Sequence, residues 1–299
     1  MSDTALAGAG LDADLRLALR AAWAAGIAVM RDFGGEHVVV EKAPDQPLTA
    51  ADLEADRILR MMLVGARPGY GWLSEETRDR PDRLDASRVW IVDPIDGTRS
   101  YIAGRPEFGI SIGLAEQGRA VLGIIYNPAT AEVYWAIRGG GAWTASLESE
   151  LGPGPASRLA VSAWSVEDQA VLLASRSEIA AGEFDPFHGG WRIRPTGSTA
   201  YKLAKIAAGE GDVFLSRGPK SEWDVCAGAL LVEEAGGRVT DLNGEALGYN
   251  RPDPYVHGIL ATNGRLHDYV LGVVRTLPPA PRLRGKGRDP LHPGFQQEE

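Results

Sequence analysis

Strand-like and helix-like segments alternate along the C-terminal half of this 299-residue chain. Two short apolar runs, Ala170–Ala174 and Val213–Leu215, have the length and composition of buried strands. Two longer runs, Ala200–Ala208 and Val225–Ala235, have the apolar spacing of helices. Segments that alternate in this way pack as helices on the faces of a sheet, so the pattern predicts a layered α/β fold.

The N-terminal half is predicted to combine helices with an antiparallel sheet. An alanine-rich amphipathic helix is expected over Asp12–Phe33, and a loop at Thr49–Asp52 leads into a second helix over Leu53–Val64. His37–Glu41 is a β-branched run between them. Strand patterns separated by short turns, which favour antiparallel pairing, cover Phe108–Leu114, Ala120–Tyr126 and Glu132–Ile137.

One segment marks a boundary between two subdomains. Leu147–Ser157 is rich in Gly, Pro and Ser and has no hydrophobic period. We therefore expect an N-terminal α+β subdomain over residues 1–146 and a C-terminal α/β subdomain over residues 158–276. Residues 277–299 lack any apolar period and are expected to form a disordered tail.

Charge and cysteine content exclude several classes of protein. A formal net charge of -9 argues against a nucleic-acid partner, because such binding depends on Lys and Arg that neutralise phosphates. The single cysteine, Cys226, has no partner for an intramolecular disulfide, which favours a reducing compartment and a cytoplasmic protein. The uncharged run Ala21–Met30 is too short to span a bilayer, so no membrane segment is expected.

Three acidic segments offer ligands for a metal ion. They are Ser74–Thr77, Asp93–Thr98 and Glu222–Asp224, the last of which opens a predicted helix. Magnesium prefers carboxylate, carbonyl and water oxygens and is often completed by the phosphate oxygens of a substrate. An acidic protein that binds a small phosphorylated substrate needs such local positive charge, so the segments predict a Mg²⁺ cofactor.

The segment DPIDGT carries most of the predicted chemistry. It follows a short apolar strand, Val89–Val92, so its acidic residues are expected on the loop where that strand ends. Asp93 and Asp96 can face one ion with the Ile95 carbonyl between them, while Thr98 presents a hydroxyl to the attacking water. The spacing predicts hydrolysis by a metal-activated water.

Each motif alone also has an ordinary structural interpretation. Asp-Pro and Asp-Gly pairs are typical of turns, and a Glu75–Glu76 pair is typical of a solvated surface. A scaffold that binds metal or phosphate without catalysis is therefore an alternative. The presence of all the acidic segments together with Asp52 and Thr98 favours catalysis.

The ordered set of motifs resembles the lithium-sensitive inositol monophosphatase superfamily, which includes bisphosphate nucleotidases and fructose bisphosphatases. WIVDPIDGT, the preceding LSEE and the later WDVCAGALLVEEAGG carry the resemblance, which spans about Lys42–Asn250. It implies a layered αβαβα sandwich with the site in a cleft between its halves. It also implies that Asp52 and Thr98 polarise the attacking water, that Glu75 is catalytic, and that the metal ligands are Glu75, Asp93, the Ile95 carbonyl, Asp96 and Asp224.

Substrate contacts are expected around the same loop. The backbone N–H groups of Gly97 and Thr98 should hold phosphate oxygens, and the helix start at Gly197 and Ser198 offers another anion site, with plain helix capping as the alternative. Asp224 is expected to contact substrate as well as metal. The remaining candidates are three arginines that would bind a second phosphate, Arg99, Arg176 and Arg217, with an ordinary solvated arginine as the alternative for Arg99 and Arg176.

Details of the loops favour one substrate. Lys42–Asp52, Ala174–Glu178 and the GPKSEWD segment resemble bacterial 3′(2′),5′-bisphosphate nucleotidases, which implies hydrolysis of 3′-phosphoadenosine 5′-phosphate to AMP and phosphate. Inositol-specific relatives have a glutamate where this chain has Ser216–Arg217, and an arginine suits a second phosphate better than a carboxylate does. One position departs from the nucleotidase pattern: such nucleotidases commonly have a lysine where this chain has Arg99. Inositol 1-phosphate is the second candidate substrate, and histidinol phosphate or a sugar bisphosphate is a further alternative. A homodimer is one expected assembly.

Overall fold

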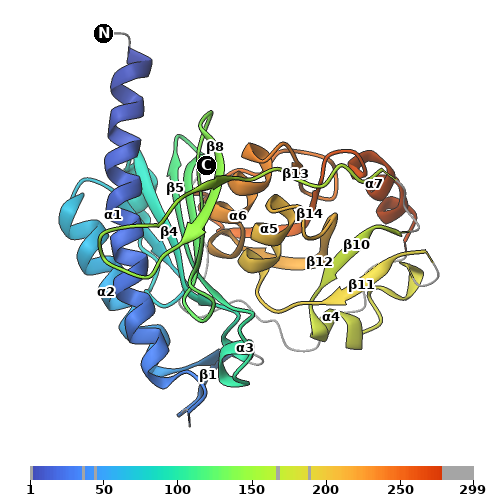
Figure 1. Cartoon of the computed structure of the whole chain (residues 1–299), viewed down its shortest axis with the longest axis horizontal. Helices are drawn as coiled ribbons and strands as arrows, with labels where there is room; N and C mark the ends of the chain where they lie inside the picture. Colours follow the sequence, from blue (N-terminus) through green and yellow to red (C-terminus); the bar gives the residue numbers. More distant parts are fainter. Residues whose placement is uncertain (1–2, 36–37, 44–45, 166–168, 188–189, 278–299) are drawn as a thin grey trace.

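The computed structural model describes all residues except 1–2, 36–37, 44–45, 166–168, 188–189 and 278–299. Helices and sheets alternate across the molecule in five layers, from α1 (Asp3–Asp32) to α7 (His267–Thr276) (Figure 1). The αβαβα sandwich expected from the sequence is therefore confirmed. The expected tail, from Pro278 onward, lies outside the described residues. No helix in the described part of the chain is long and apolar enough to cross a membrane.

The first sheet has seven strands in the order β3-β4-β5-β6-β7-β8-β9. Only β3 and β4 pair in parallel, and all later neighbours are antiparallel, as expected for the three central strands. Its strands are β3 (Gly71–Ser74), β4 (Arg88–Asp96), β5 (Gly109–Glu116), β6 (Arg119–Asn127), β7 (Glu132–Ile137), β8 (Gly141–Ser146) and β9 (Ser157–Arg158).

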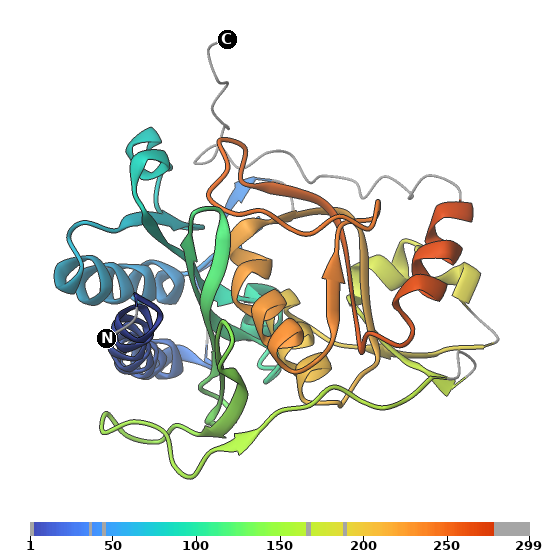
Figure 2. The same cartoon turned by 90° about the horizontal axis from the view of Figure 1, so that it is seen from above.

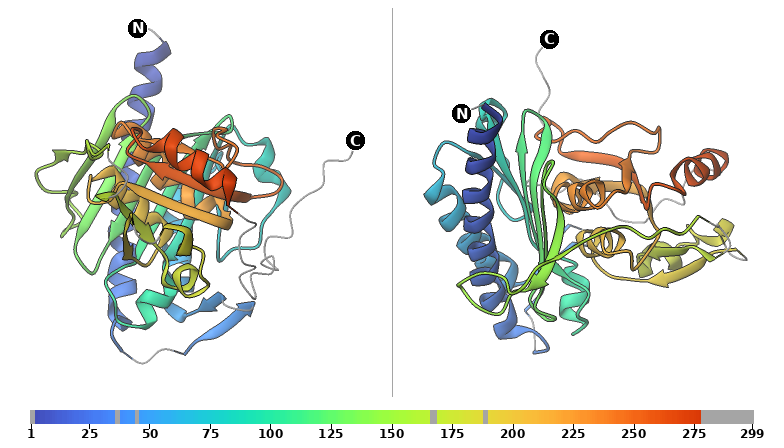
Figure 3. Two further views of the ribbon diagram at one scale, coloured as in Figure 1. Left: turned by 90° about the vertical axis from the view of Figure 1, so that its right-hand side faces the viewer. Right: turned by 45° about the horizontal axis from the view of Figure 1, so that its top comes forward.

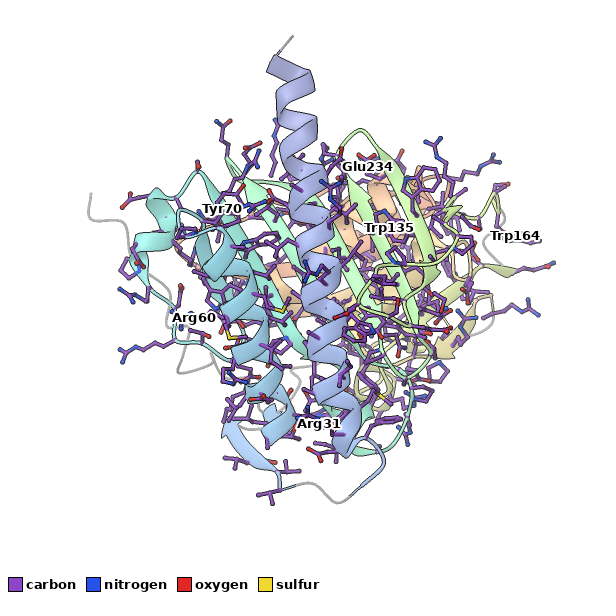
Figure 4. The ribbon with its side chains drawn as sticks, turned by 60° about the vertical axis from the view of Figure 1, so that its left-hand side comes forward. Arg31, Arg60, Tyr70, Trp135, Trp164 and Glu234 are labelled. Carbon is purple, nitrogen blue, oxygen red and sulfur yellow. The ribbon has the colours of Figure 1, made fainter. Side chains whose placement is uncertain are left out.

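Two helices cover the outer face of this sheet. Figure 4 shows α1 and α2 (Ala50–Ala66) side by side across the strands, with Arg31 near the end of α1 and Arg60 on α2. Small side chains let α1 approach closely, since a Cβ on Gly26 would lie 2.5 Å from the Tyr126 ring. Figure 2 shows α1 nearly end-on beside α2. A small two-stranded sheet of β1 (Val40–Ala43) and β2 (Gln46–Leu48) joins these helices.

The second sheet has five strands in the order β11-β10-β12-β14-β13. β10 pairs in parallel with β11 and β12, whereas β14 is antiparallel to β12 and β13. Figure 3 shows α5 and α6 between the two sheets and α7 on the outer side. The bounds are β10 (Val171–Ala174), α4 (Arg176–Ala180), β11 (Arg192–Pro195), α5 (Thr199–Ala207), β12 (Val213–Ser221), α6 (Glu222–Glu234), β13 (Arg238–Thr240) and β14 (Tyr255–Thr262).

Glycines in the first sheet let α6 lie directly on it. A Cβ on Gly113 would lie 2.6 Å from the Sγ of Cys226, and one on Gly123 would lie 2.6 Å from the carbonyl oxygen of Ala227. Side chains at these positions would push the helix outward. The close packing fixes the first turn of α6, which carries Asp224.

Two local expectations were wrong. β4 does not end at Val92 but continues through Asp96, with a register irregularity between Asp93 and Asp96, so the acidic residues lie within an irregular strand end. Asp52 lies not in a loop but in the first turn of α2, because Thr49 and Asp52 form a reciprocal capping box. The subdomain boundary at 147–157 stays a prediction, although β9 of the first sheet overlaps its end.

Candidate active site

A cavity of about 550 Å³ lies where segments of the two sheets and the α5 and α6 helices meet. One wall comes from the end of β4 and from α3 (Thr98–Ile102), and the other from α4, β12 and the starts of α5 and α6. Most of the predicted site residues line it: Glu75, Asp93, Ile95, Asp96, Gly97, Thr98, Arg99, Gly197, Ser198 and Asp224.

Three carboxylates converge on this cavity. Glu75 follows β3, Asp93 lies in β4 and Asp224 lies in the first turn of α6, and one carboxylate oxygen of each is within 4.8 Å of the others. Burial raises the pKa of Asp93 well above its ordinary value, and the negative charges of Glu75 and Asp96 add to that effect. A divalent cation bound by hard oxygen ligands would relieve this repulsion, so the residues present fit the metal expected from the sequence.

Asp96 lies outside that group of three. Its Oδ2 accepts hydrogen bonds from the Ser198 hydroxyl at 2.5 Å and from the backbone N–H of Ala200. Asp96 therefore provides an acceptor for a backbone N–H group in the first turn of α5. Burial raises the pKa of Asp96 even so, although both hydrogen bonds act to lower it. Its role as a metal ligand, like that of the Ile95 carbonyl, stays a prediction.

Thr98 and Asp52 form a hydrogen-bonded pair at the cavity. The Thr98 hydroxyl lies 3.2 Å from Oδ1 of Asp52 and 3.1 Å from the carbonyl oxygen of Ile95. The other oxygen of Asp52, Oδ2, accepts from the backbone N–H of Thr49 at 2.8 Å and from its hydroxyl at 2.6 Å. Burial raises the pKa of Asp52 to about 6, although the bonds from Thr49 act to lower it.

Lys42 was not predicted to belong to the site. Its Nζ lies 3.0 Å from Oε1 of Glu75 and 2.7 Å from Oε1 of Glu76, so it places a positive charge on the acidic segment. Burial acts to lower the pKa of Lys42, but the two carboxylates raise it above its ordinary value. Burial, followed by the charge of Glu75, raises the pKa of Glu76 to about 8.

Two buried lysines on the opposite wall were also missed. The Nζ of Lys202 donates to Ser175 Oγ at 2.9 Å and to the carbonyl of Thr196 at 3.3 Å. The Nζ of Lys220 lies 3.2 Å from Oε1 of Glu178. The available signal was a pair of lysines, Lys202 and Lys205, in a largely apolar helix and a further lysine in the GPKSEWD segment.

The predicted arginines differ in position. Arg99 lines the cavity, and so does Arg176, whose guanidinium bonds both oxygens of Glu107. Arg217 is partly buried and is not among the residues that line the cavity, whereas Lys220, on the same strand, is. The register of β12 against β14 shifts between Ser216 and Pro219, which changes the side-chain directions along that stretch. The substrate role of Arg217 stays a prediction.

The five-layered fold and the carboxylate cluster in its cavity are consistent with a metal-binding enzyme of the αβαβα type. A family model described as "Inositol monophosphatase family" matches residues 11–278. The chain belongs to that family.

Relatives in the family have different names. A Rhizobium meliloti protein named inositol-1-monophosphatase is 37% identical over 77% of this chain and 86% of its own length. A Mycobacterium tuberculosis histidinol-phosphatase is 37% identical over 86% of this chain and 96% of its own length. A 3′(2′),5′-bisphosphate nucleotidase CysQ from Salmonella typhimurium is 31% identical over 78% of this chain and 92% of its own length.

Solved structures confirm the fold. The extragenic suppressor protein suhB from Bartonella henselae matches with a TM-score of 0.76 and 31% identity, covering 88% of this chain and 99% of that one. The expected superfamily is therefore confirmed. The finer expectation, a particular similarity to bisphosphate nucleotidases, is not supported, because relatives with other names are more similar in sequence.

Proposed function

We propose that this chain hydrolyses the phosphate monoester of a small polyol in a magnesium-dependent reaction, with inositol 1-phosphate as the first candidate substrate. The observation that carries the proposal is the convergence of Glu75, Asp93 and Asp224 within 4.8 Å beside the Asp52–Thr98 pair. Two relatives that are each 37% identical to this chain, one named inositol-1-monophosphatase and the other histidinol-phosphatase, support a small monophosphate as substrate. A reducing, cytoplasmic location and a homodimer remain part of this proposal.

The proposed mechanism assigns each residue a task. Glu75, Asp93 and Asp224 would hold the ion, and Asp96 and the Ile95 carbonyl are further candidate ligands. When bound, Mg²⁺ lowers the pKa of water and neutralises charge on the phosphate. The backbone N–H groups of Gly97 and Thr98 would hold phosphate oxygens. A glycine is needed at position 97, because it adopts φ 100° and a Cβ there would lie 3.0 Å from the Glu107 carbonyl.

Thr98 and Asp52 would orient the attacking water. Oδ1 of Asp52 and the Ile95 carbonyl both lie within reach of the Thr98 proton. Since Thr49 occupies Oδ2, Oδ1 is the Asp52 oxygen that would accept it. A hydroxyl that donates its one proton to Asp52 has lone pairs free to accept a hydrogen bond from water. The pair can therefore align a water for attack on a phosphorus atom held beside it.

A second candidate, 3′-phosphoadenosine 5′-phosphate, is favoured by the positive charge on the wall opposite the carboxylates. Lys202 and Lys220 are buried there and line the cavity, and Arg176 stands at the same wall. A second phosphate would find charge-assisted partners at this wall. The Arg217 that the sequence analysis assigned to this role is a further candidate.

A substrate panel tests the proposal. Phosphate release with and without Mg²⁺ is measured from inositol 1-phosphate, histidinol phosphate, fructose 1,6-bisphosphate and 3′-phosphoadenosine 5′-phosphate. The highest kcat/KM for inositol 1-phosphate supports the first candidate, and the highest value for the bisphosphate nucleotide supports the second. No release from any of them would contradict both.

Two variants separate the candidates further. A lost charge-assisted contact costs about 1.5–3 kcal/mol, so Lys202→Met and Arg217→Ala are each expected to raise KM for a bisphosphate nucleotide by roughly ten- to a hundredfold if that residue binds the second phosphate. Hydrolysis of a monophosphate should change little. Equal loss on both substrates would place the residue at the reacting phosphate or in the fold.

A further inference from the structure

The three converging carboxylates come from separate segments of the chain. Glu75 lies on the turn after β3, in the half built on the first sheet, and Asp224 lies at the start of α6 between the sheets. Their separation therefore depends on how the segment after Glu75 is held against the start of α6. A metal site tolerates errors of only a few tenths of an ångström in its ligand positions.

A buried arginine anchors the segment that follows Glu75. Arg83 lies in the short helix η1 (Pro81–Asp85), and its side chain is 1% exposed. Its Nε and Nη2 donate to the two oxygens of Asp79 at 2.6 and 2.8 Å. The same guanidinium donates to Asn250 Oδ1 at 2.8 Å and to the Arg251 carbonyl at 2.9 Å, so it reaches a segment of the other half.

A buried glutamate holds that other segment from the opposite side. Glu222, the first residue of α6, is 0% exposed, and its Oε2 accepts from the backbone N–H of Asn250 at 2.6 Å. Its Oε1 accepts from the backbone N–H of Arg251 at 3.1 Å, and its own N–H donates to the Pro254 carbonyl at 2.8 Å. Asn250 has φ 57°, a left-handed conformation that asparagine tolerates well.

We propose that Asp79, Arg83, Asn250 and Glu222 form a brace that sets the distance between Glu75 and Asp224. The brace runs from the segment after Glu75, through the Asn250–Arg251 backbone, to the residue two places before Asp224. None of its members lines the cavity, so they would act on the cation site only through Glu75 and Asp224, as positioning residues. This inference rests on the proposed function, since it assigns a task in metal binding.

The brace also reaches the cavity wall. Arg251 donates through Nη2 to the Tyr255 carbonyl, and the ring of Tyr255 packs edge-on against Trp223 with centroids 6.4 Å apart. Tyr255 and Trp223 both line the cavity. A loosened brace should therefore displace one cavity wall as well as one metal ligand.

The test measures Mg²⁺ affinity directly by isothermal titration calorimetry on the full chain. Asn250→Gly keeps the left-handed backbone but removes the side chain that bonds Arg83. Glu222→Gln keeps the shape but replaces one of the two oxygens that accept from the Asn250 and Arg251 backbone with an NH₂ donor. Partners that orient metal ligands commonly contribute ten- to a hundredfold to affinity, so each variant should raise the Kd for Mg²⁺ by about tenfold. Activity of Asn250→Gly should recover largely at saturating Mg²⁺.

Two controls separate positioning from general stability. Arg80→Ala removes an exposed side chain beside η1 that lies 3.5 Å from exposed Asp82, keeps the backbone N–H that bonds Asp79, and should leave the Kd unchanged. Val270→Ala, in the outer helix α7, should lower the melting temperature while leaving the Kd unchanged. A melting temperature lowered in the brace variants with a wild-type Kd would overturn the inference and leave the proposed function standing. Failure of the wild-type chain to bind Mg²⁺ would overturn both.

Discussion

The hydroxyl oxygen of Thr98 lies 3.2 Å from Oδ1 of Asp52, although the two residues are far apart in sequence and belong to different helices. The contact depends on the capping box of α2, which turns one oxygen of Asp52 back to Thr49 and leaves the other to meet Thr98.

Thr98→Ala should therefore lower kcat by about 10²–10⁴-fold while leaving KM and the melting temperature nearly unchanged, because a positioned proton acceptor typically contributes that much. Thr98→Ser keeps the hydroxyl and is the matched control. Steady-state kinetics at saturating Mg²⁺ measure the effect. A Thr98→Ala enzyme with wild-type kcat would remove the pair from the mechanism.

Asp93→Asn and Asp96→Asn should differ in their effect on stability. Asp93 is a buried carboxylate among other carboxylates, so Asp93→Asn should abolish turnover and raise the melting temperature of the metal-free protein. The sequence alone predicts the same for Asp96→Asn. Because Asp96 accepts two hydrogen bonds at the start of α5, we now expect that variant to melt lower, by roughly 1 kcal/mol of stability. Thermal unfolding without metal compares the two.

Gly123→Ala should destabilise the chain by about 1–3 kcal/mol, because the added Cβ would lie 2.6 Å from the carbonyl oxygen and 2.9 Å from the Cα of Ala227, both backbone atoms that a side-chain rotation cannot move. Gly272→Ala in α7 meets nothing within 4 Å and should stabilise by up to about 1 kcal/mol. Urea unfolding of both variants is the measurement. Equal effects would mean that α6 does not approach the sheet as closely as described.

His267 should make stability depend on pH. Its Nε2 lies 2.9 Å from the Thr240 hydroxyl and its Nδ1 lies 3.1 Å from the Thr262 hydroxyl. Thr240 donates its proton to the Asp241 carbonyl, so it accepts from Nε2, and Nδ1 must accept from Thr262 as a neutral ring nitrogen. Burial, with a smaller effect from Arg238, lowers the pKa of His267 to about 4.

A histidine with a folded-state pKa below its unfolded value binds its proton more readily when unfolded. The contribution of His267 to the free energy of unfolding is therefore complete above pH 6.5 and is lost as the pH falls towards 4. Between pH 7 and 5 the contribution of His267 alone should fall by about 1–2 kcal/mol, while buried carboxyls whose pKa is raised, such as Asp52, act in the opposite direction. Urea unfolding at both pH values should show a smaller loss for His267→Gln. An identical loss in that variant would assign the pH dependence to other groups.

Features that depend on local pattern were predictable from the sequence. The alternation of strand and helix segments predicted the layers, and short turns between apolar runs predicted the antiparallel pairing of β5, β6 and β7. The ordered acidic segments predicted a metal site, and Glu75, Asp93 and Asp224 do converge.

Features that depend on tertiary packing were not predictable. The side-chain direction of Asp96 follows from a register irregularity in β4 and from the position of the α5 start, neither of which has a local signal. Lys42 reaches Glu75 only because the β1 strand lies beside the turn after β3. Lys202 is buried because its helix, α5, is enclosed between two sheets, which the sequence of the helix alone does not reveal.

Because α6 lies between the two sheets, it couples the unfolding of the two halves of the chain. The buried side chains of α6 and its close contacts with Gly113 and Gly123 make this one helix part of the core of both halves. Neither half can lose it without exposing a large apolar face. A chain cut within residues 147–157 should therefore give two fragments that stay unfolded when separate and regain structure only when mixed, and the intact protein should melt in a single calorimetric peak.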